Sequence, residues 1–214
     1  MLLDQIEYGS LLAYSPYGKS EDAWRSHTVT NQIKNDVVLQ SQMSMSESIA
    51  NQISRNLETL PFADLFKVNP ILIPTPKSSF IRPGDLWVPQ RLATALVNRG
   101  LGKEAISCLS RITPVTKSAG TPSEDRPAAE VHRDSMGVKR ILDKPKEILL
   151  IDDVVTRGAT VLGAANKLAE AFPDARIRAF IAMCTRTRPK DFVRINDPRR
   201  GEIYHTVNGT FREQ

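Results

Sequence analysis

Apolar residues recur along the chain with two spacings, one typical of strands and one typical of helices. Short β-rich runs predict strands at 71–73, at EAISCLSRI (104–112), at EILLIDDVV (147–155) and at ARIRAFIAMCTRT (175–187). The third run is the strongest, because it is apolar at every position from Ile148 to Ile151, as a strand buried on both faces requires. Helical spacing falls between the runs, at 88–98 and 158–172. This alternation predicts an α/β fold with a mostly parallel twisted sheet flanked by helices.

The first 66 residues carry mostly helical signals. Ser44 and Glu47 form a capping-box pattern ahead of apolar residues at helical spacing, which predicts a helix over about 45–59. A second helix is predicted after Ser20. We therefore expect residues 1–66 to form a helical N-terminal cap or hood, residues 67–186 the α/β core, and residues 187–214 a basic C-terminal extension whose short strand EIYHTV lies at the sheet edge.

Between the second and third predicted strands lies a long polar segment, residues 113–136, rich in Pro, Gly and Ser. A segment of this kind inside a compact domain is usually either a functional lid or disordered.

The composition is that of a folded globular protein. The 214 residues are 41% apolar and 25% charged, which argues against a disordered, collagen-like or membrane-embedded chain. The length suits one sizeable domain with an appendage. A net charge of +5 is compatible with either nucleic acid or a phosphorylated small molecule as a partner.

The cysteines and the N-terminus indicate a cytoplasmic protein. Cys108 and Cys184 stand in apolar surroundings without a CxxC or Cys/His cluster, so we expect buried free thiols and neither disulfide nor zinc. The first ten residues lack the basic and continuously apolar stretches of a signal peptide, and no window approaches the roughly 18 apolar residues of a membrane span.

The strongest strand runs directly into the segment that carries candidate chemistry, ILLIDDVVTRGAT at 148–160. Ligands bind at the carboxyl ends of parallel strands, and a loop entering a helix offers free amides to an anion. Thr156, Gly158 and Thr160 suit an anion-binding turn, while Asp152 and Asp153 are placed to bind sugar hydroxyls or metal-bound water. A phosphate beside a diol describes a ribose phosphate. The plainer interpretation is a strand end followed by a turn that caps the helix.

This run resembles the phosphoribosyl pyrophosphate (PRPP) motif of type I phosphoribosyltransferases, an apolar strand, two acidic residues and a Thr-rich loop. The chain is most similar to the ComF-like group, because IPTPKSSF (73–80), Arg111 and a basic linker precede the motif in similar order. The similarity covers roughly residues 70–185. Two features depart from the family: the four-cysteine N-terminal zinc module of many ComF-like proteins is absent, and Arg157 replaces the usual second threonine.

The resemblance implies a role for each matching residue. Asp152 and Asp153 bind the ribose hydroxyls, and the ribose phosphate is held by Val155, Thr156, Arg157, Gly158, Ala159 and Thr160. Thr75, Pro76 and Lys77 match the pyrophosphate loop, in which Lys77 neutralises the leaving group. Residues 113–136 match a flexible lid over the pyrophosphate, with Lys117, Ser118, Arg126 and Arg133 as its contacts. The residues implied in catalysis are Asp152, Asp153, Lys77, Lys117 and Arg126.

The implied reaction is displacement of pyrophosphate from PRPP by a nitrogen atom of a base-like acceptor. Mg²⁺ is the implied cofactor, held by Asp152 and Asp153 mostly through PRPP and water. Two other functions stay open: a non-catalytic PRPP sensor with a nucleic-acid or protein partner, and a defence or toxin effector acting on nucleotides. For the sensor, the nucleic-acid contacts are expected at Arg194, Arg199 and Arg200. The resembled family also implies a homodimer.

Overall fold

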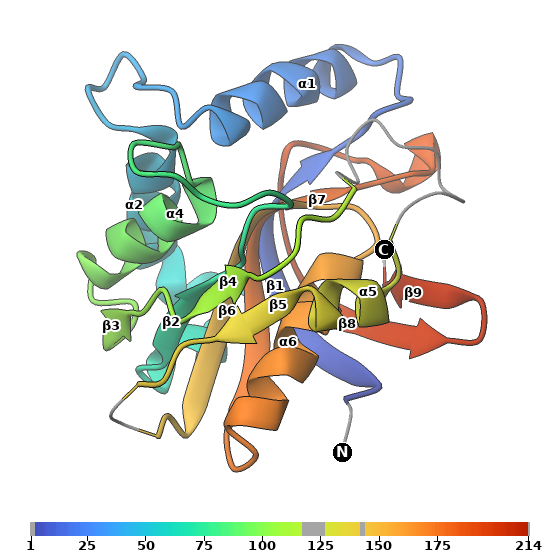
Figure 1. The fold of residues 1–214 in the computed structure, drawn as a ribbon. Helices are drawn as coiled ribbons and strands as arrows, with labels where there is room; N and C mark the ends of the chain where they lie inside the picture. Colours follow the sequence, from blue (N-terminus) through green and yellow to red (C-terminus); the bar gives the residue numbers. More distant parts are fainter. Residues whose placement is uncertain (1–2, 117–126, 142–143, 214) are drawn as a thin grey trace.

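The computed structural model describes residues 3–116, 127–141 and 144–213, and they form an α/β fold (Figure 1). A seven-stranded mixed sheet has the strand order β3-β2-β6-β7-β1-β8-β9, and β4 pairs with β5 beside it. The strands are β1 (Gln5–Tyr14), β2 (Ile71–Pro74), β3 (Glu104–Ala105), β4 (Leu109–Arg111), β5 (Met136–Val138), β6 (Glu147–Val155), β7 (Arg176–Thr185), β8 (Asn196–Thr206) and β9 (Gly209–Arg212). The α-helices are α1 (Glu21–Lys34), α2 (Met45–Asn56), α3 (Asp64–Lys67), α4 (Val88–Val97), α5 (Ala129–Asp134) and α6 (Ala159–Ala171), with 3₁₀ turns η1 (Leu57–Thr59) and η2 (Pro189–Asp191).

Most of the sheet is parallel. Strands β3, β2, β6, β7 and β1 run in one direction, while β8 is antiparallel to β1 and β9 is antiparallel to β8. The carboxyl ends of five parallel strands therefore meet at one edge of the sheet, where ligands bind in folds of this class. The prediction of a mostly parallel sheet flanked by helices is confirmed.

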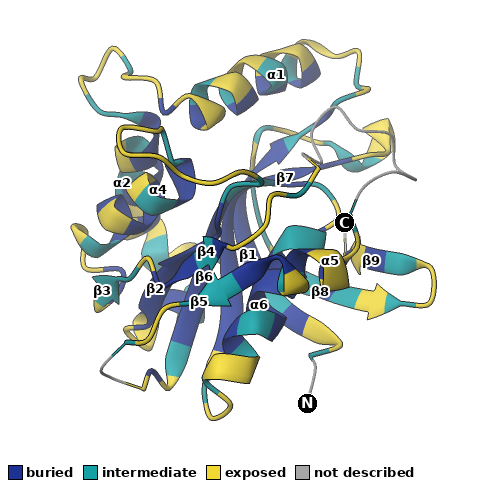
Figure 2. Cartoon of the chain, viewed as in Figure 1, coloured by how far each residue is buried: buried dark blue, intermediate teal, exposed yellow. Residues whose placement is uncertain are grey.

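Helices cover both faces of the sheet, and the central strands are buried (Figure 2). On one face, apolar residues of α1, α2 and α4 pack against Leu149 of β6 and Phe180 of β7. On the other face, α5, α6 and the β4–β5 pair pack against Leu150 and Ile181. Neighbouring residues of β6 thus point into different cores, which explains its continuously apolar sequence.

The helices predicted from periodicity are confirmed. Ser44 caps α2, and the reciprocal Ser44–Glu47 bonds of the capping box are both formed. Ser20 caps α1 by accepting a hydrogen bond from the Ala23 amide. The predicted helices over 88–98 and 158–172 correspond to α4 and α6.

The prediction that the first 66 residues are a helical cap is wrong for its first part. Residues 5–14 form β1, which lies inside the sheet between β7 and β8. The close approach of α3 and the turn before it depends on Gly9, because a Cβ there would lie 2.6 Å from Phe62 Cβ in that turn and 2.9 Å from Leu65 Cδ1 in α3. The cap therefore begins only with α1, and the sheet draws strands from all three predicted segments.

Two further predictions need correction. The run at 104–112 is not one strand: β3 joins the main sheet, and β4 pairs with β5 in a second, two-stranded sheet. The C-terminal extension does lie at the sheet edge, but its strand is longer than EIYHTV and is followed by β9.

Two other findings concern the cysteines and the membrane. Cys108 and Cys184 are both free and buried, as predicted. Within the described ranges, no helix is long and apolar enough to cross a membrane.

Candidate functional site

The candidate site lies at the carboxyl ends of β2 and β6, which are neighbours in the sheet. Their register pairs Pro74 with Ile151, so the loop after β2 and the Asp-Asp pair of β6 begin side by side. The Thr75 amide donates to the Ile151 carbonyl at 2.9 Å and prolongs the pairing by one residue. Two segments separated by more than seventy residues in the sequence, and both predicted to bind PRPP, are thereby brought together.

Asp152 is buried and points toward the loop after β2. Its Oδ1 accepts a hydrogen bond of 2.7 Å from the hydroxyl of Thr75, which is itself buried. The indole of Trp87 fixes Thr75 from the other side by donating to its carbonyl at 2.8 Å. Burial and, second, the charge of Asp153 raise the pKa of Asp152 to about 8. Arg111 and Asp152 attract each other electrostatically, but this attraction does not offset the burial of the carboxylate.

Asp153 is the more accessible member of the pair. The amide of Val154 donates to its Oδ1 at 2.8 Å. Burial raises the pKa of Asp153, while that hydrogen bond and the charge of Lys34 at the end of α1 act in the opposite direction. Helix α1 therefore brings a cation toward the Asp-Asp pair, a relationship that the sequence did not predict.

The loop after β6 leads into α6 through a left-handed residue. Gly158 has φ 99° and occupies the N-cap position, where no side chain caps the helix. A Cβ at this position would also lie 2.6 Å from Ile203 Cγ2 of β8, so two independent constraints require glycine. The uncapped amides of the 13-residue α6 begin directly after it, as an anion-binding turn requires.

The other predicted phosphate-loop residues surround this turn. Thr156 and Thr160 are partly accessible, Arg157 is exposed, and Val155 belongs to the core beneath. The Thr156 hydroxyl lies 3.4 Å from that of Thr185 at the end of β7. Ala159, which is partly buried, is the first residue of α6 and contributes its backbone amide.

Arg111 of β4 holds the predicted pyrophosphate loop, Thr75 to Lys77, by a hydrogen bond to its backbone. The Arg111 Nε–H donates to the Lys77 carbonyl at 2.9 Å. The Lys77 ammonium lies 3.6 Å from the carboxylate of Asp85, and both side chains are about one-third exposed. Lys77 is thus accessible at the predicted place, although it already has an acidic partner.

Part of the predicted lid is packed against the core. Residues 129–134 form α5, which contacts α6, and Arg133 makes ion pairs with Asp134 and with Glu170 of α6. Arg133 therefore lies on a helix packed against the core and not on a free loop, and its contact with an anion stays a prediction. Lys117, Ser118 and Arg126 lie outside the described residues.

Arg212 of β9 is a functional candidate that the sequence did not indicate. Its guanidinium is buried, donates to the carbonyls of Thr156 and Thr185, and also contacts the Tyr8 hydroxyl at 2.9 Å. It thereby ties the phosphate loop to β1 and β7. An isolated arginine near the end of the sequence gives no signal of such a position.

The donor set at the strand ends fits a hard cation that arrives with a phosphate ligand. Mg²⁺ takes oxygen ligands and is commonly held by one or two carboxylates together with substrate phosphates. Asp152 and Asp153 supply such carboxylates, and the raised pKa of Asp152 is what a nearby cation would lower. A ready-made metal cage is not present: among the described residues, no cluster of three or more His, Cys, Asp or Glu side chains could hold an ion.

Comparison with known proteins leaves the site to be interpreted from its geometry. A scan against protein-family models found no matching family, and a search of curated proteins found no match.

Proposed function

We propose that this chain binds PRPP and transfers its phosphoribosyl group to a nitrogenous, base-like acceptor. The observation that carries the proposal is the meeting of three elements at one sheet edge: the Asp152–Asp153 pair, the Gly158 turn into α6, and the loop from Thr75 to Lys77. A sugar diol, a phosphate and a pyrophosphate would each find the chemistry that it needs there. The resemblance of 148–160 to the PRPP motif points to the same ligand.

Each part of the ligand is assigned to named groups. Asp153 and Asp152 accept hydrogen bonds from the ribose hydroxyls. The amides at the start of α6 and the hydroxyls of Thr156 and Thr160 bind the 5-phosphate. Lys77 exchanges its ion pair with Asp85 for one with the pyrophosphate. Breaking the first pair costs little free energy because both side chains are partly exposed.

In the reaction, a nitrogen lone pair of the acceptor forms a bond to the anomeric carbon as the bond from that carbon to the pyrophosphate oxygen breaks. The electron pair leaves with pyrophosphate, and the acceptor nitrogen loses its proton to solvent. When bound with pyrophosphate, Mg²⁺ would neutralise charge on the leaving oxygens, and Asp152 and Asp153 would hold it mostly through water and sugar oxygens. The protein itself contributes positioning and charge stabilisation.

The same site would also serve a sensor that binds PRPP without turnover. Of the arginines predicted to contact nucleic acid in that case, Arg199 pairs with Asp197 at 2.8 Å, and Arg200 pairs with Glu7 and Asp64 at 2.8 and 2.9 Å. Arg194 is exposed, and the pairs of Arg200 are as exposed as that of Lys77 and Asp85, so these ion pairs do not decide between the two functions. We favour the transferase because the resemblance of 148–160 is to the motif of transferases.

The transferase is tested by measuring pyrophosphate release from PRPP and Mg²⁺ with a panel of purine and pyrimidine bases. We expect release that depends on one class of base and is lost in Asp153→Asn. Binding of PRPP with no base-dependent release across the panel would contradict turnover and favour the sensor.

A further inference from the structure

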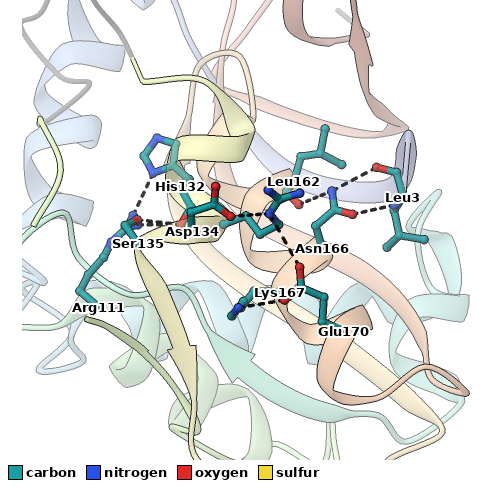
Figure 3. Close-up of polar contacts among 10 residues, drawn as sticks. Leu3, Arg111, His132, Asp134, Ser135, Leu162, Asn166, Lys167 and Glu170 are labelled. Atoms are coloured by element: carbon teal, nitrogen blue, oxygen red, sulfur yellow. Dashed lines mark hydrogen bonds and ion pairs between the residues drawn. The ribbon is translucent and has the colours of Figure 1, made fainter. Parts of the chain in front are cut away.

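His132 of α5 is a fully buried histidine that bridges two segments of the proposed site. Its Nδ1 lies 2.9 Å from Nη2 of Arg111 (Figure 3), and its Nε2 lies 3.3 Å from the Thr160 hydroxyl in the first turn of α6. Arg111 in turn donates to the Lys77 carbonyl, so one chain of contacts joins the loop after β2 to the start of α6.

The partners of His132 determine which ring nitrogen carries the hydrogen. Arginine has donors only, so Nδ1 must accept from Arg111 and cannot itself be protonated. Burial, and next the charge of Arg111, lowers the pKa of His132 to about 4, so the ring is neutral at pH 7. The single ring hydrogen is therefore on Nε2, where it faces Thr160.

The ring has little freedom to turn away from this arrangement. The Arg111 guanidinium is held by the carbonyls of Lys77 and His132 and by the Ser135 hydroxyl, which itself donates to the His132 carbonyl at 2.7 Å. Both the arginine fork and the histidine backbone are thus fixed, and a flipped ring would place its Cδ2–H, which cannot accept a hydrogen bond, against the arginine N–H.

The consequence falls on the hydroxyl of Thr160. If Nε2–H donates to Oγ1, the hydroxyl hydrogen must point elsewhere, and among the described residues Thr160 has no other hydrogen-bond partner. We propose that His132 is a positioning residue that commits the Thr160 hydroxyl hydrogen to a phosphate group bound at the start of α6. This inference rests on the proposed function, because it takes the anion to be the 5-phosphate of PRPP.

The chemical benefit is a preset donor. A free threonine hydroxyl rotates between donating and accepting, whereas a phosphate offers only acceptors at this position. A hydroxyl that already accepts from His132 meets the phosphate as a donor, and hydrogen bonds to a charged acceptor are the stronger class. Arg111 acts one step further away, by fixing the ring.

The first test reads the tautomer directly. Long-range ¹⁵N–¹H correlation on the ¹⁵N-labelled protein at pH 7 distinguishes the two ring nitrogens, with His132→Gln used to assign the signal. We expect a protonated Nε2 and an unprotonated Nδ1. A protonated Nδ1 would overturn the proposal, whatever the protein binds.

The second test measures binding of ribose 5-phosphate to two variants, each of which replaces only one of the two ring nitrogens of His132 by an equivalent polar atom. The glutamine amide nitrogen can take the place of Nε2, and the asparagine carbonyl oxygen can take the place of Nδ1. We expect His132→Gln to bind ribose 5-phosphate within about twofold of the wild type, and His132→Asn and Thr160→Val to bind about tenfold more weakly. The double variant His132→Asn/Thr160→Val should be no weaker than Thr160→Val alone.

The outcomes separate the two proposals. A purely structural role for the ring, as an anchor for Arg111, predicts the opposite order, with His132→Asn tolerated and His132→Gln impaired. Independent, additive losses in the double variant would also refute the role of His132, while leaving the ribose-phosphate site intact. If the folded wild type binds no ribose 5-phosphate, the site itself is wrong and this inference fails with it. Should His132→Asn not fold, Thr160→Val and the tautomer measurement still decide.

Discussion

Thr75 and Asp152 come from two different strands and share a buried hydrogen bond of 2.7 Å, with the threonine hydroxyl as donor. The bond joins the loop after β2 to the Asp-Asp pair at the end of β6. It also lowers the pKa of Asp152, against the larger effect of burial. The two predicted ligand-binding segments are therefore coupled energetically as well as adjacent.

Replacement of Thr75 by valine should destabilise the fold. The change keeps the shape of the side chain but removes the shorter of the two hydrogen bonds to Asp152 Oδ1 and leaves only the Asp153 amide at 3.1 Å, which should cost about 1–3 kcal/mol in the free energy of unfolding. Urea denaturation measures this loss. Thr28→Val, at an exposed position of α1, is the matched control and should change stability by less than about 0.5 kcal/mol. Equal effects of the two variants would show that the Thr75–Asp152 bond has no special role.

Gly158→Ala should be more harmful than the same change at another left-handed glycine. At Gly158 the new methyl group meets both an unfavourable φ of 99° and the side chain of Ile203. At Gly209, where φ is 109°, nothing lies within 4 Å of the new Cβ, so only the backbone strain applies. We expect a loss of about 1 kcal/mol for Gly209→Ala and at least about 2 kcal/mol for Gly158→Ala. Thermal melting of both variants checks the order, and a larger loss at Gly209 would contradict the packing described around the turn.

The raised pKa of Asp152 predicts how stability changes with pH. The folded protein holds this proton up to about pH 8, whereas the unfolded chain releases it near 3.8. The folded state therefore binds more protons in this interval, and the free energy of unfolding should fall as the pH rises, by at most about 1.4 kcal/mol per unit.

Asp152→Asn removes this titration while its amide oxygen can still accept from Thr75. Between pH 5 and pH 8, the free energy of unfolding of the variant should rise relative to that of the wild type. The samples are treated with a chelator so that no divalent cation binds to the carboxylates. Asp174→Asn changes an exposed residue in the turn after α6, and its free energy of unfolding should depend on pH in the same way as that of the wild type. Parallel profiles for Asp152→Asn as well would mean that Asp152 is ionised in the folded protein.

Arg111 should not tolerate lysine. Its guanidinium bonds to the Lys77 carbonyl, to His132 and to Ser135, a fork that an ammonium group cannot reproduce. We expect Arg111→Lys to lower the free energy of unfolding by about 2–4 kcal/mol, because it leaves buried polar groups without hydrogen-bond partners. The exposed Arg55→Lys should be nearly neutral. A neutral Arg111→Lys would indicate that the bridge between the two loops does not hold the site together.

The sequence predicted the parts of the fold whose signal is local. The continuously apolar run at Ile148–Ile151 predicted the buried strand β6, and the Ser44–Glu47 pattern predicted α2 with its capping box. The Asp-Asp pair and Gly158 were found because strand, acidic residues and turn follow each other directly in the sequence.

What the sequence did not predict depends on contacts between distant segments. β1 carries polar and charged residues at several positions, and only its place between β7 and β8 makes it a strand of the sheet. His132 lies in the segment 113–136 that was predicted to be a flexible lid, but α5 packs on α6 and buries this residue. Arg212 lies fifty-odd residues after the phosphate loop and reaches Thr156 only because β9 returns along β8.

Titration of PRPP into the protein in the presence of Mg²⁺ tests the central claim most directly, by isothermal calorimetry on the wild type, Asp152→Asn/Asp153→Asn and Asp174→Asn. We predict saturable one-to-one binding to the wild type and to Asp174→Asn, and a loss of at least about tenfold in affinity in the double variant. No binding to the folded wild type, or equal binding to the double variant, would contradict the assignment of a ribose-phosphate site to the ends of β2 and β6.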